Sequence, residues 1–402
     1  MNISRFDNEH IYDQEIINTP IPDDEYEYKN QINTKYMKGE TRLVTEQARY
    51  PLPTLIELFD KSTAYELQPD FQRRKGRWDN DKKSKLIESF IINVPVPPVF
   101  LYEVSFANYE VMDGLQRITT IIDFYKDKYK LSGLIQWREL NGRTYSELPE
   151  KIREGIDRRY LSSIILLNES ATTTQKAIEM KQLVFERLNT GGEKLSPQEI
   201  RNAIYNGKMN QLCLKLSDNT TFKKLWGLKE DNATATIKDK LYSNMGDVEL
   251  VLRFFAMRFV DNFTGKLDVF LDNYLKKANL FPDETLDKLE NLFIRNISVA
   301  FDLLDDKAFK IYKHHYNALV WSSEAQRTVY DPMMLALTQL QLTDDEIMKV
   351  DKENLKNELQ DFYEKHENDF DGKKQSRSDI QYRVKLIYNF FSCYFKREVK
   401  NA

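Results

Sequence analysis

The chain has 402 residues, of which 41% are hydrophobic and 12% aromatic, so it is long and apolar enough to bury a sizeable core and is not a disordered protein. Its 59 Lys and Arg residues against 63 Asp and Glu give a formal net charge of -4, which excludes a general attraction of the whole chain to nucleic acid or to anionic membranes. Two cysteines are too few for a disulfide framework or a cysteine-built zinc site, and the absence of a signal-peptide pattern and of any run of about 18 apolar residues predicts a cytoplasmic protein that spans no membrane.

The N-terminal part of the chain divides by charge. Residues 1–48 contain ten acidic and five basic side chains with little periodicity, which predicts an acidic arm. Residues 72–85 contain seven basic and two acidic side chains, and 7 minus 2 is a local charge of +5. Any attraction to a polyanion is therefore expected to be local.

Between residues 79 and 202 the pattern alternates between helix and strand. It predicts a helix through Leu86, Ile87, Phe90 and Ile91 that ends before Pro95, and then strands over 99–104 and 109–112 joined by a turn. A helix is expected after Asp113–Gly114, and a strand over 161–167. The last two predicted elements are a helix over 176–188 that ends at Asn189–Gly192 and a helix that starts with a capping box at Ser196–Glu199. From about residue 210 onwards helical periodicity dominates. We therefore predict an α+β protein, with a mixed α/β domain over 49–208 and an all-helical domain over 209–402.

The segment Tyr109–Thr120 is predicted to be a strand, a sharp turn and a helix start, which is the geometry of an anion site. Gly114 permits close backbone approach, and Asp113 at the strand end could hold a divalent metal or orient a water. The side chains that can add donors are Gln116, Arg117, Thr119 and Thr120. The pattern is equally compatible with a structural role, in which Asp113 caps the helix and Arg117 pairs with a surface acid.

Two further segments are candidates for ligand contacts. The basic run contains Arg73, Arg74 and Arg77 between the aromatic residues Phe71 and Trp78, followed by Lys82, Lys83 and Lys85, a composition that suits phosphate binding and base stacking. The alternative is a solvated basic surface with the two aromatic side chains in the core. The second segment, residues 185–202, places Arg187 and Asn189 beside the glycine pair that ends a helix, and a plain helix cap explains it equally well.

Several of these segments follow one another in a recognisable order. They are Gln72–Arg74 with Trp78, Lys85–Ser89 running to Val96–Pro98, Asp113–Arg117 with Thr119 and Thr120, and Phe185–Gly192 running to Glu199–Arg201. In this order they resemble the GmrSD-type N-terminal domain of modification-dependent restriction and other anti-phage systems, over about Leu52 to Tyr205. The resemblance implies a core similar to the ParB/sulfiredoxin fold. Thiol phosphorylation of the sulfiredoxin kind is excluded, because no cysteine precedes Cys213.

The family's Asp-Gly-Gln-Gln-Arg signature is associated with nucleotide binding and hydrolysis. This chain matches it except at Leu115, which can neither donate nor accept a hydrogen bond. The resemblance implies Asp113, Gln116 and Arg117 as catalytic residues, and Gly114, Thr119, Thr120, Arg73, Arg74, Arg187 and Asn189 as nucleotide contacts. It implies a nucleoside triphosphate and Mg²⁺, the metal at Asp113, as cofactors.

DNA is the expected partner, contacted through Arg77, Lys82, Lys83 and Lys85. Longer relatives carry an HNH-type nuclease, but His314 and His315 lack its spacing and are interpreted as surface histidines in a helical context. A separate nuclease subunit is therefore a further expected partner, and an oligomer is left open.

Two functions of other classes remain open. One is a DNA-binding sensor or regulator that hydrolyses nothing and uses the basic run, with or without the basic stretch Lys373–Lys400. The other is a metal-dependent nuclease with its metal held by Asp113 and neighbouring carboxylates.

Overall fold

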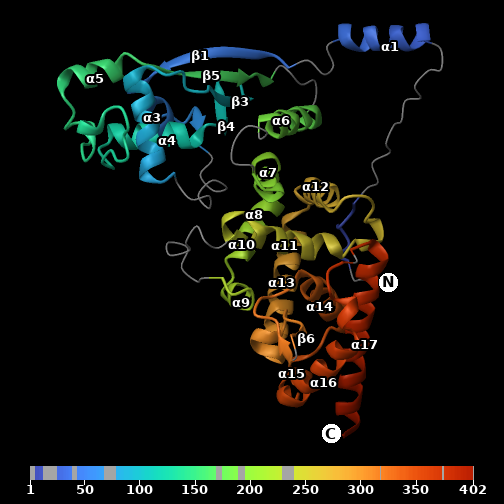
Figure 1. Ribbon diagram of the computed structural model, residues 1–402. Helices are drawn as coiled ribbons and strands as arrows, with labels where there is room; N and C mark the ends of the chain where they lie inside the picture. Colours follow the sequence, from blue (N-terminus) through green and yellow to red (C-terminus); the bar gives the residue numbers. More distant parts are fainter. Residues whose placement is uncertain are drawn as a thin grey trace. The chain divides into compact units, whose positions relative to one another are not determined.

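The computed structural model describes residues 5–11, 25–38, 43–67, 78–168, 174–188, 195–228, 240–316, 318–373 and 375–401. The chain forms two compact units, one of residues 15–204 and one of residues 1–14 together with 205–402 (Figure 1). They are called the N-terminal unit and the C-terminal unit below. The predicted domains instead divide at 48/49 and at 208/209.

A five-stranded mixed sheet organises the N-terminal unit. Its strands are β1 (Thr45–Pro51), β2 (Tyr65–Glu66), β3 (Val99–Ser105), β4 (Asn108–Asp113) and β5 (Tyr160–Leu166), in the spatial order β1-β5-β3-β4-β2. The strands β1 and β5 are antiparallel, as are β3 and β4, whereas β5 runs parallel to β3 and β2 runs parallel to β4. The β3–β4 hairpin places the end of β4 beside the start of β3, with Asp113 opposite Phe100.

One face of this sheet carries the core of the unit. Val99 and Leu101 of β3, Val111 of β4 and Leu161 and Ile165 of β5 are all buried, because alternate residues of a strand point to the same face. The helices α3 (Asn80–Ile92) and α4 (Leu115–Tyr125) add to that core Leu86, Ile87, Phe90, Ile118, Ile121 and Ile122. These helices and strands agree with the predicted ones, since their apolar periodicity is strong.

The remaining helices of the N-terminal unit are α1 (Glu25–Lys38), α5 (Glu150–Asp157), α6 (Thr174–Leu188) and α7 (Pro197–Ile204), with short helical turns η1 (Leu52–Thr54), η2 (Glu57–Lys61) and η3 (Arg138–Leu140). The capping box predicted for α7 is present, because Ser196 and Glu199 exchange backbone-to-side-chain hydrogen bonds. The predicted acidic arm contains α1 and the start of β1. Neither has a regular apolar stripe, so the sequence pattern did not reveal them.

The C-terminal unit is mostly helical. Its helices are α8 (Lys208–Ser217), α9 (Thr220–Leu225), α10 (Lys240–Ser243), α11 (Gly246–Met257), α12 (Leu267–Ala278), α13 (Asp283–Leu304), α14 (Arg327–Leu340), α15 (Asp344–Met348), α16 (Lys352–Lys365) and α17 (Arg377–Asn401), with turns η5 (Val260–Asn262), η6 (Asp305–Lys307) and η7 (Glu367–Asp369). The helix α11 lies at its centre and packs on α8, α10, α12 and α14. None of the helices in the described part of the chain has the length and apolar character that crossing a bilayer requires.

The prediction of an all-helical second half is wrong at one hairpin. The strands β6 (Tyr312–His315) and β7 (Ala318–Trp321) pair antiparallel, so His314 and His315 lie on a strand. Tyr312 faces Trp321 across the pair with ring centroids 5.4 Å apart, a cross-strand aromatic contact that stabilises such hairpins. His314 is exposed and its Nδ1 lies 2.8 Å from Oε2 of Glu367, which agrees with its interpretation as a surface histidine.

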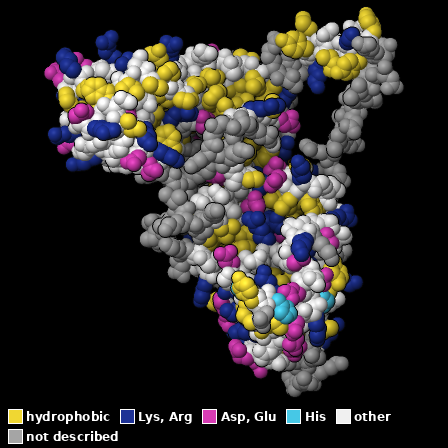
Figure 2. All heavy atoms as spheres, viewed as in Figure 1, with side chains coloured by type: hydrophobic (Ala, Val, Ile, Leu, Met, Phe, Trp, Pro, Cys, Tyr) yellow, Lys and Arg dark blue, Asp and Glu magenta, His cyan; other side chains and the backbone are white. Residues whose placement is uncertain are grey.

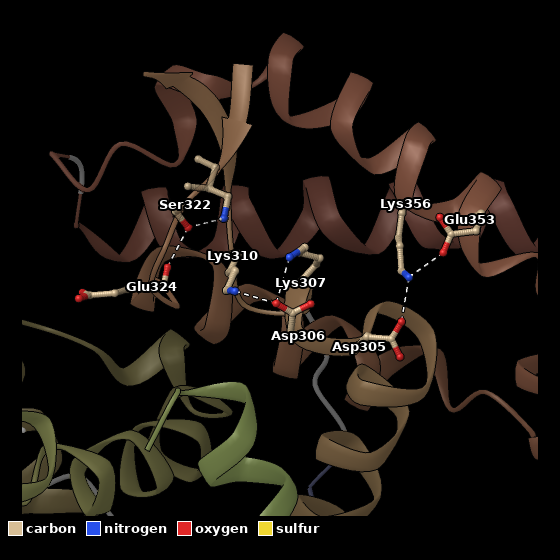
Figure 3. A network of polar contacts seen from close by, with 9 residues as sticks. Asp305, Asp306, Lys307, Lys310, Ser322, Glu324, Glu353 and Lys356 are labelled. Atoms are coloured by element: carbon tan, nitrogen blue, oxygen red, sulfur yellow. Dashed lines mark hydrogen bonds and ion pairs between the residues drawn. The ribbon is translucent and has the colours of Figure 1, made fainter. Parts of the chain in front are cut away.

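Charged side chains of both signs alternate over the visible face of the C-terminal unit (Figure 2). A network at the end of α13 shows how they are satisfied (Figure 3). Asp306 accepts from Lys307 at 3.0 Å and Lys310 at 2.8 Å, while Lys356 of α16 donates to Asp305 at 2.8 Å. The network ties the end of α13 to α16, so these charges have a structural role.

Candidate nucleotide site

The junction between β4 and α4 requires a glycine. Gly114 adopts φ +96°, a left-handed conformation that side chains disfavour. A Cβ atom there would lie 2.9 Å from Nη2 of Arg117 and closer still to Cγ1 of Val99. The backbone therefore turns sharply from the strand into the helix, and no side chain caps the start of α4.

Asp113 and Arg117 form an ion pair across this turn. Nη2 of Arg117 lies 2.6 Å from Oδ2 of Asp113 and 3.2 Å from the carbonyl oxygen of Pro98. The Arg117 side chain is only 14% exposed whereas that of Asp113 is 52% exposed, so the guanidinium is held in place and the carboxylate reaches solvent. Nε of Arg117 is buried with no hydrogen-bond partner in the described part of the chain. The structural alternative thus holds only in part, because Arg117 pairs with Asp113 and Asp113 does not cap α4.

The other predicted residues of α4 differ in how accessible they are. Oε1 of Gln116 accepts a long hydrogen bond of 3.4 Å from the backbone N–H of Trp78. The Thr119 hydroxyl donates to the carbonyl of Leu115 at 2.9 Å, and Thr120 is fully buried. Leu115, the departure from the signature, is buried in the core. Gln116 and Arg117 are therefore the α4 side chains best placed for a ligand.

The predicted DNA contacts and the remaining predicted nucleotide contacts are only partly within the described residues. Arg73, Arg74 and Arg77 of the basic run, and Asn189, lie outside them. Lys82 and Lys85 are exposed on α3. Lys83 instead lies 3.6 Å from Asp123 and 5.0 Å from the centre of the Tyr129 ring, with 13% of its side chain exposed. Arg187 lies exposed in the last turn of α6, on a different element from the β4–α4 junction.

A buried lysine that the sequence analysis missed ties the strand of Asp113 to two helices. Nζ of Lys181 on α6 forms an ion pair with Glu110 of β4 and donates to the carbonyl of Ala203 on α7 at 2.9 Å. Glu110 alternates with Val111 along β4 and so points away from the core face. The signal available in the sequence was a lysine directly after the core residue Met180, on a helix that is otherwise amphipathic.

The carboxylate that the junction offers to a metal ion is that of Asp113, which is 52% exposed. Within the described ranges, no group of three or more His, Cys, Asp and Glu side chains is arranged to hold a metal ion. Mg²⁺ in nucleotide sites takes one or two carboxylates and completes its octahedron with phosphate oxygens and waters. The single exposed carboxylate of Asp113 fits that pattern, although one of its oxygens is engaged by Arg117.

Comparison with known proteins identifies the domain that carries this junction. Residues 55–206 match the family model of the GmrSD restriction endonuclease, N-terminal domain. The match includes the β4–α4 junction, Lys181 and α7. Neither the comparison with curated proteins nor that with solved structures found a significant match. Over residues 55–206, the chain is thus similar to the N-terminal domain of the GmrSD restriction endonuclease.

Proposed function

We propose that this protein binds a nucleoside triphosphate at the β4–α4 junction, hydrolyses it, and uses the cycle in a restriction-type defence function that acts on DNA. The observation that carries the nucleotide part is the glycine turn into an uncapped helix start, with a partly buried arginine beside it. The restriction and DNA part rests on the family description.

The junction supplies what a phosphate group needs. The first backbone N–H groups of α4 carry the positive end of the helix dipole, and the glycine lets a ligand approach the backbone closely. The guanidinium of Arg117 can bind two phosphate oxygens at once. In the structure this guanidinium binds an anionic group, the carboxylate of Asp113, and a phosphate group can take the place of that carboxylate.

Each residue then has a distinct role. Arg117 neutralises charge on the transferred phosphoryl group, and Gln116 orients the attacking water through its amide. Asp113, once Arg117 turns to the phosphate, would be the residue that holds Mg²⁺, through its carboxylate. Bound Mg²⁺ would lower the charge on the phosphate oxygens. The ParB/sulfiredoxin-like assignment is part of this proposal, supported by the mixed sheet whose strand β4 leads through a glycine turn into α4.

Calorimetric titration with each nucleoside triphosphate tests the binding step. Arg117→Ala should lose nucleotide binding and keep the unfolding transition of the wild type. Arg49→Ala is the matched control, because Arg49 is an arginine of the same unit that donates to the Tyr160 hydroxyl at 3.2 Å, on an edge strand. Equal affinity of the Arg117 variant and wild type would refute the proposal.

A DNA-binding regulator without hydrolysis is a second candidate, favoured by the exposed Lys82 and Lys85 beside the basic run. It predicts DNA affinity that falls steeply with salt and no phosphate release with any nucleotide.

A metal-dependent nuclease is a third candidate function, favoured by the description of the matched family as a restriction endonuclease. Incubating plasmid with Mg²⁺ or Mn²⁺, with and without nucleotide, separates it from the other two. A separate nuclease subunit and an oligomer remain part of the leading proposal.

A further inference from the structure

The loop that follows α4 is fastened to α3 from Asn80 to Glu88. Nδ2 of Asn80 donates to the carbonyl of Lys130 at 2.9 Å. Ser132 donates its hydroxyl to Asp81 at 2.7 Å and its backbone N–H to the Ser84 hydroxyl at 2.9 Å. These side chains sit on successive turns of one side of α3, so the loop follows that side of the helix.

Glu88 lies one helical turn after Ser84 on the same side of α3, and it fixes the backbone of the next part of the loop. Its carboxylate is buried, and Oε1 accepts the backbone N–H groups of Ile135, Gln136 and Trp137 at 3.0, 2.8 and 3.0 Å. Three successive N–H groups that converge on one carboxylate form a closed anion nest. We call residues 130–138 the Glu88 loop.

The Glu88 loop presents apolar side chains to solvent from a fixed backbone. Ile135 is 58% exposed and Trp137 is 37% exposed. Ile92, one helical turn after Glu88 on α3, and Val94 are 42% and 50% exposed. These four exposed apolar side chains lie on α3, on the residues that follow it and on the loop that Glu88 fastens to it, and a fixed backbone lowers the entropy lost on binding.

Cations flank these apolar side chains. Arg138 follows Trp137 directly, and Lys85 lies one turn before Glu88 on the same side of α3. Both are exposed, and neither has an ion-pair partner among the residues that the structure describes. Other lysines of the N-terminal unit differ from these two, since Lys83, Lys126 and Lys128 each form an ion pair with an aspartate. Glu139, which follows Arg138, is exposed as well, so two cations and one carboxylate border the exposed apolar side chains.

We infer that the Glu88 loop is a DNA-contact surface, in which Trp137 stacks on an unpaired base and Arg138 and Lys85 bind the flanking phosphates. The identity of the partner rests on the proposed function. The combination favours DNA over a protein partner, because Arg138 and Lys85 have no ion-pair partner in the described part of the chain and the partly exposed indole of Trp137 offers a face on which a base can stack. Stacking needs an accessible base face, so single-stranded DNA or a duplex with an unpaired base is bound more tightly than a fully paired duplex.

Fluorescence anisotropy with a labelled single-stranded oligonucleotide tests this inference on the full chain. Trp137→Ala should weaken binding by about five- to one-hundred-fold, and Trp137→Phe should restore most of the affinity, because a phenyl ring still stacks. Arg138→Ala should weaken binding and lower the slope of log affinity against log salt by about 1. Phe106→Ala is the matched control, since Phe106 is an aromatic side chain 92% exposed at the β3–β4 turn of the same unit.

Two results overturn the inference in distinguishable ways. If wild type binds the oligonucleotide and both Trp137→Ala and Arg138→Ala bind it equally well, the Glu88 loop is not a DNA surface, and the proposed function is untouched. If wild type binds no DNA at low salt, the DNA part of the proposed function fails together with this inference, while nucleotide binding measured on Arg117→Ala still judges the nucleotide part. Unfolding curves of each variant show whether a lost affinity reflects a lost fold.

Discussion

At the scale of single residues, Gly114 and Arg117 show why the β4–α4 junction was predictable and its details were not. An Asp-Gly turn between a strand pattern and a helix pattern is visible in the sequence. The contact of Arg117 with the carbonyl of Pro98 and the close approach of Gly114 to Val99 depend on the start of β3, which the chain pattern does not place beside the turn. The nest around Glu88 left no signal at all, because its donors are backbone N–H groups that every residue type except proline has.

Gly114→Ala should destabilise the N-terminal unit by about 2–4 kcal/mol, since the new methyl group meets both a left-handed backbone and the Val99 side chain. Gly142→Ala is the matched control, because Gly142 has φ +82° but nothing within 4 Å of its Cβ position. Its cost should be about 1 kcal/mol. Denaturant unfolding measures both variants, and equal losses would contradict the close packing at the junction.

Tyr145 predicts a pH dependence of stability. Burial, and then the hydrogen bonds to Asp157, raise the pKa of Tyr145 from 10.0 to about 12. A raised pKa means that the contribution of this hydroxyl is complete below about pH 10 and is lost as the pH rises towards about 12. The stability difference between wild type and Tyr145→Phe should therefore shrink across that window. A difference that stays constant with pH would show that the phenol makes no such contribution.

At the scale of elements, prediction succeeded where apolar periodicity was strong and failed where strand pairing replaced it. The helices α3, α4 and α6 and the strands β3, β4 and β5 were predicted from their periodicity. The edge strand β1 and the hairpin β6–β7 were missed, because β1 has mostly exposed side chains and the hairpin is only four residues a strand. Length is what separates a short strand from a helix turn in a sequence.

Lys181 makes an element-scale prediction, because it joins β4 to α6 and α7. Lys181→Met removes the cation from the buried carboxylate of Glu110 and should cost about 3–5 kcal/mol, measured by denaturant unfolding. The double variant Lys181→Met with Glu110→Leu should recover a large part of that loss, since no buried charge remains. Lys61→Met, in an exposed pair with Glu57, should leave the transition unchanged. A Lys181 variant as stable as the Lys61 variant would contradict the buried tie.

At the scale of the whole molecule, the nearly neutral composition is an average over locally different surfaces. The start of the predicted acidic arm belongs to the C-terminal unit, where Glu9 and Arg258 form a fully buried ion pair with Oε2 and Nη1 2.8 Å apart. Arg258 also lies 5.4 Å from the centre of the Phe6 ring. A segment that composition marks as a solvated arm is thus part of a core, and composition alone could not show it.

Glu9→Ala should therefore destabilise the C-terminal unit by about 3–5 kcal/mol, since it leaves the Arg258 guanidinium buried without its carboxylate. Arg5→Ala is the control from the same segment, because the Arg5 ion pair with Asp261 is 39% exposed on each side and 3.7 Å long. Its effect should be below about 1 kcal/mol. Calorimetric unfolding of both variants measures the difference, and equal effects would show that the segment is not anchored by Glu9.

The central claim is that the β4–α4 junction is a nucleotide-hydrolysing site. The most direct test is phosphate release from each nucleoside triphosphate by wild type, Asp113→Ala and Arg117→Ala, with and without DNA. The account predicts release by wild type with at least one nucleotide, and loss of that release in both variants while their unfolding curves stay close to that of wild type. Release that persists in both variants would place the chemistry elsewhere, and no release by wild type under any condition would contradict hydrolysis.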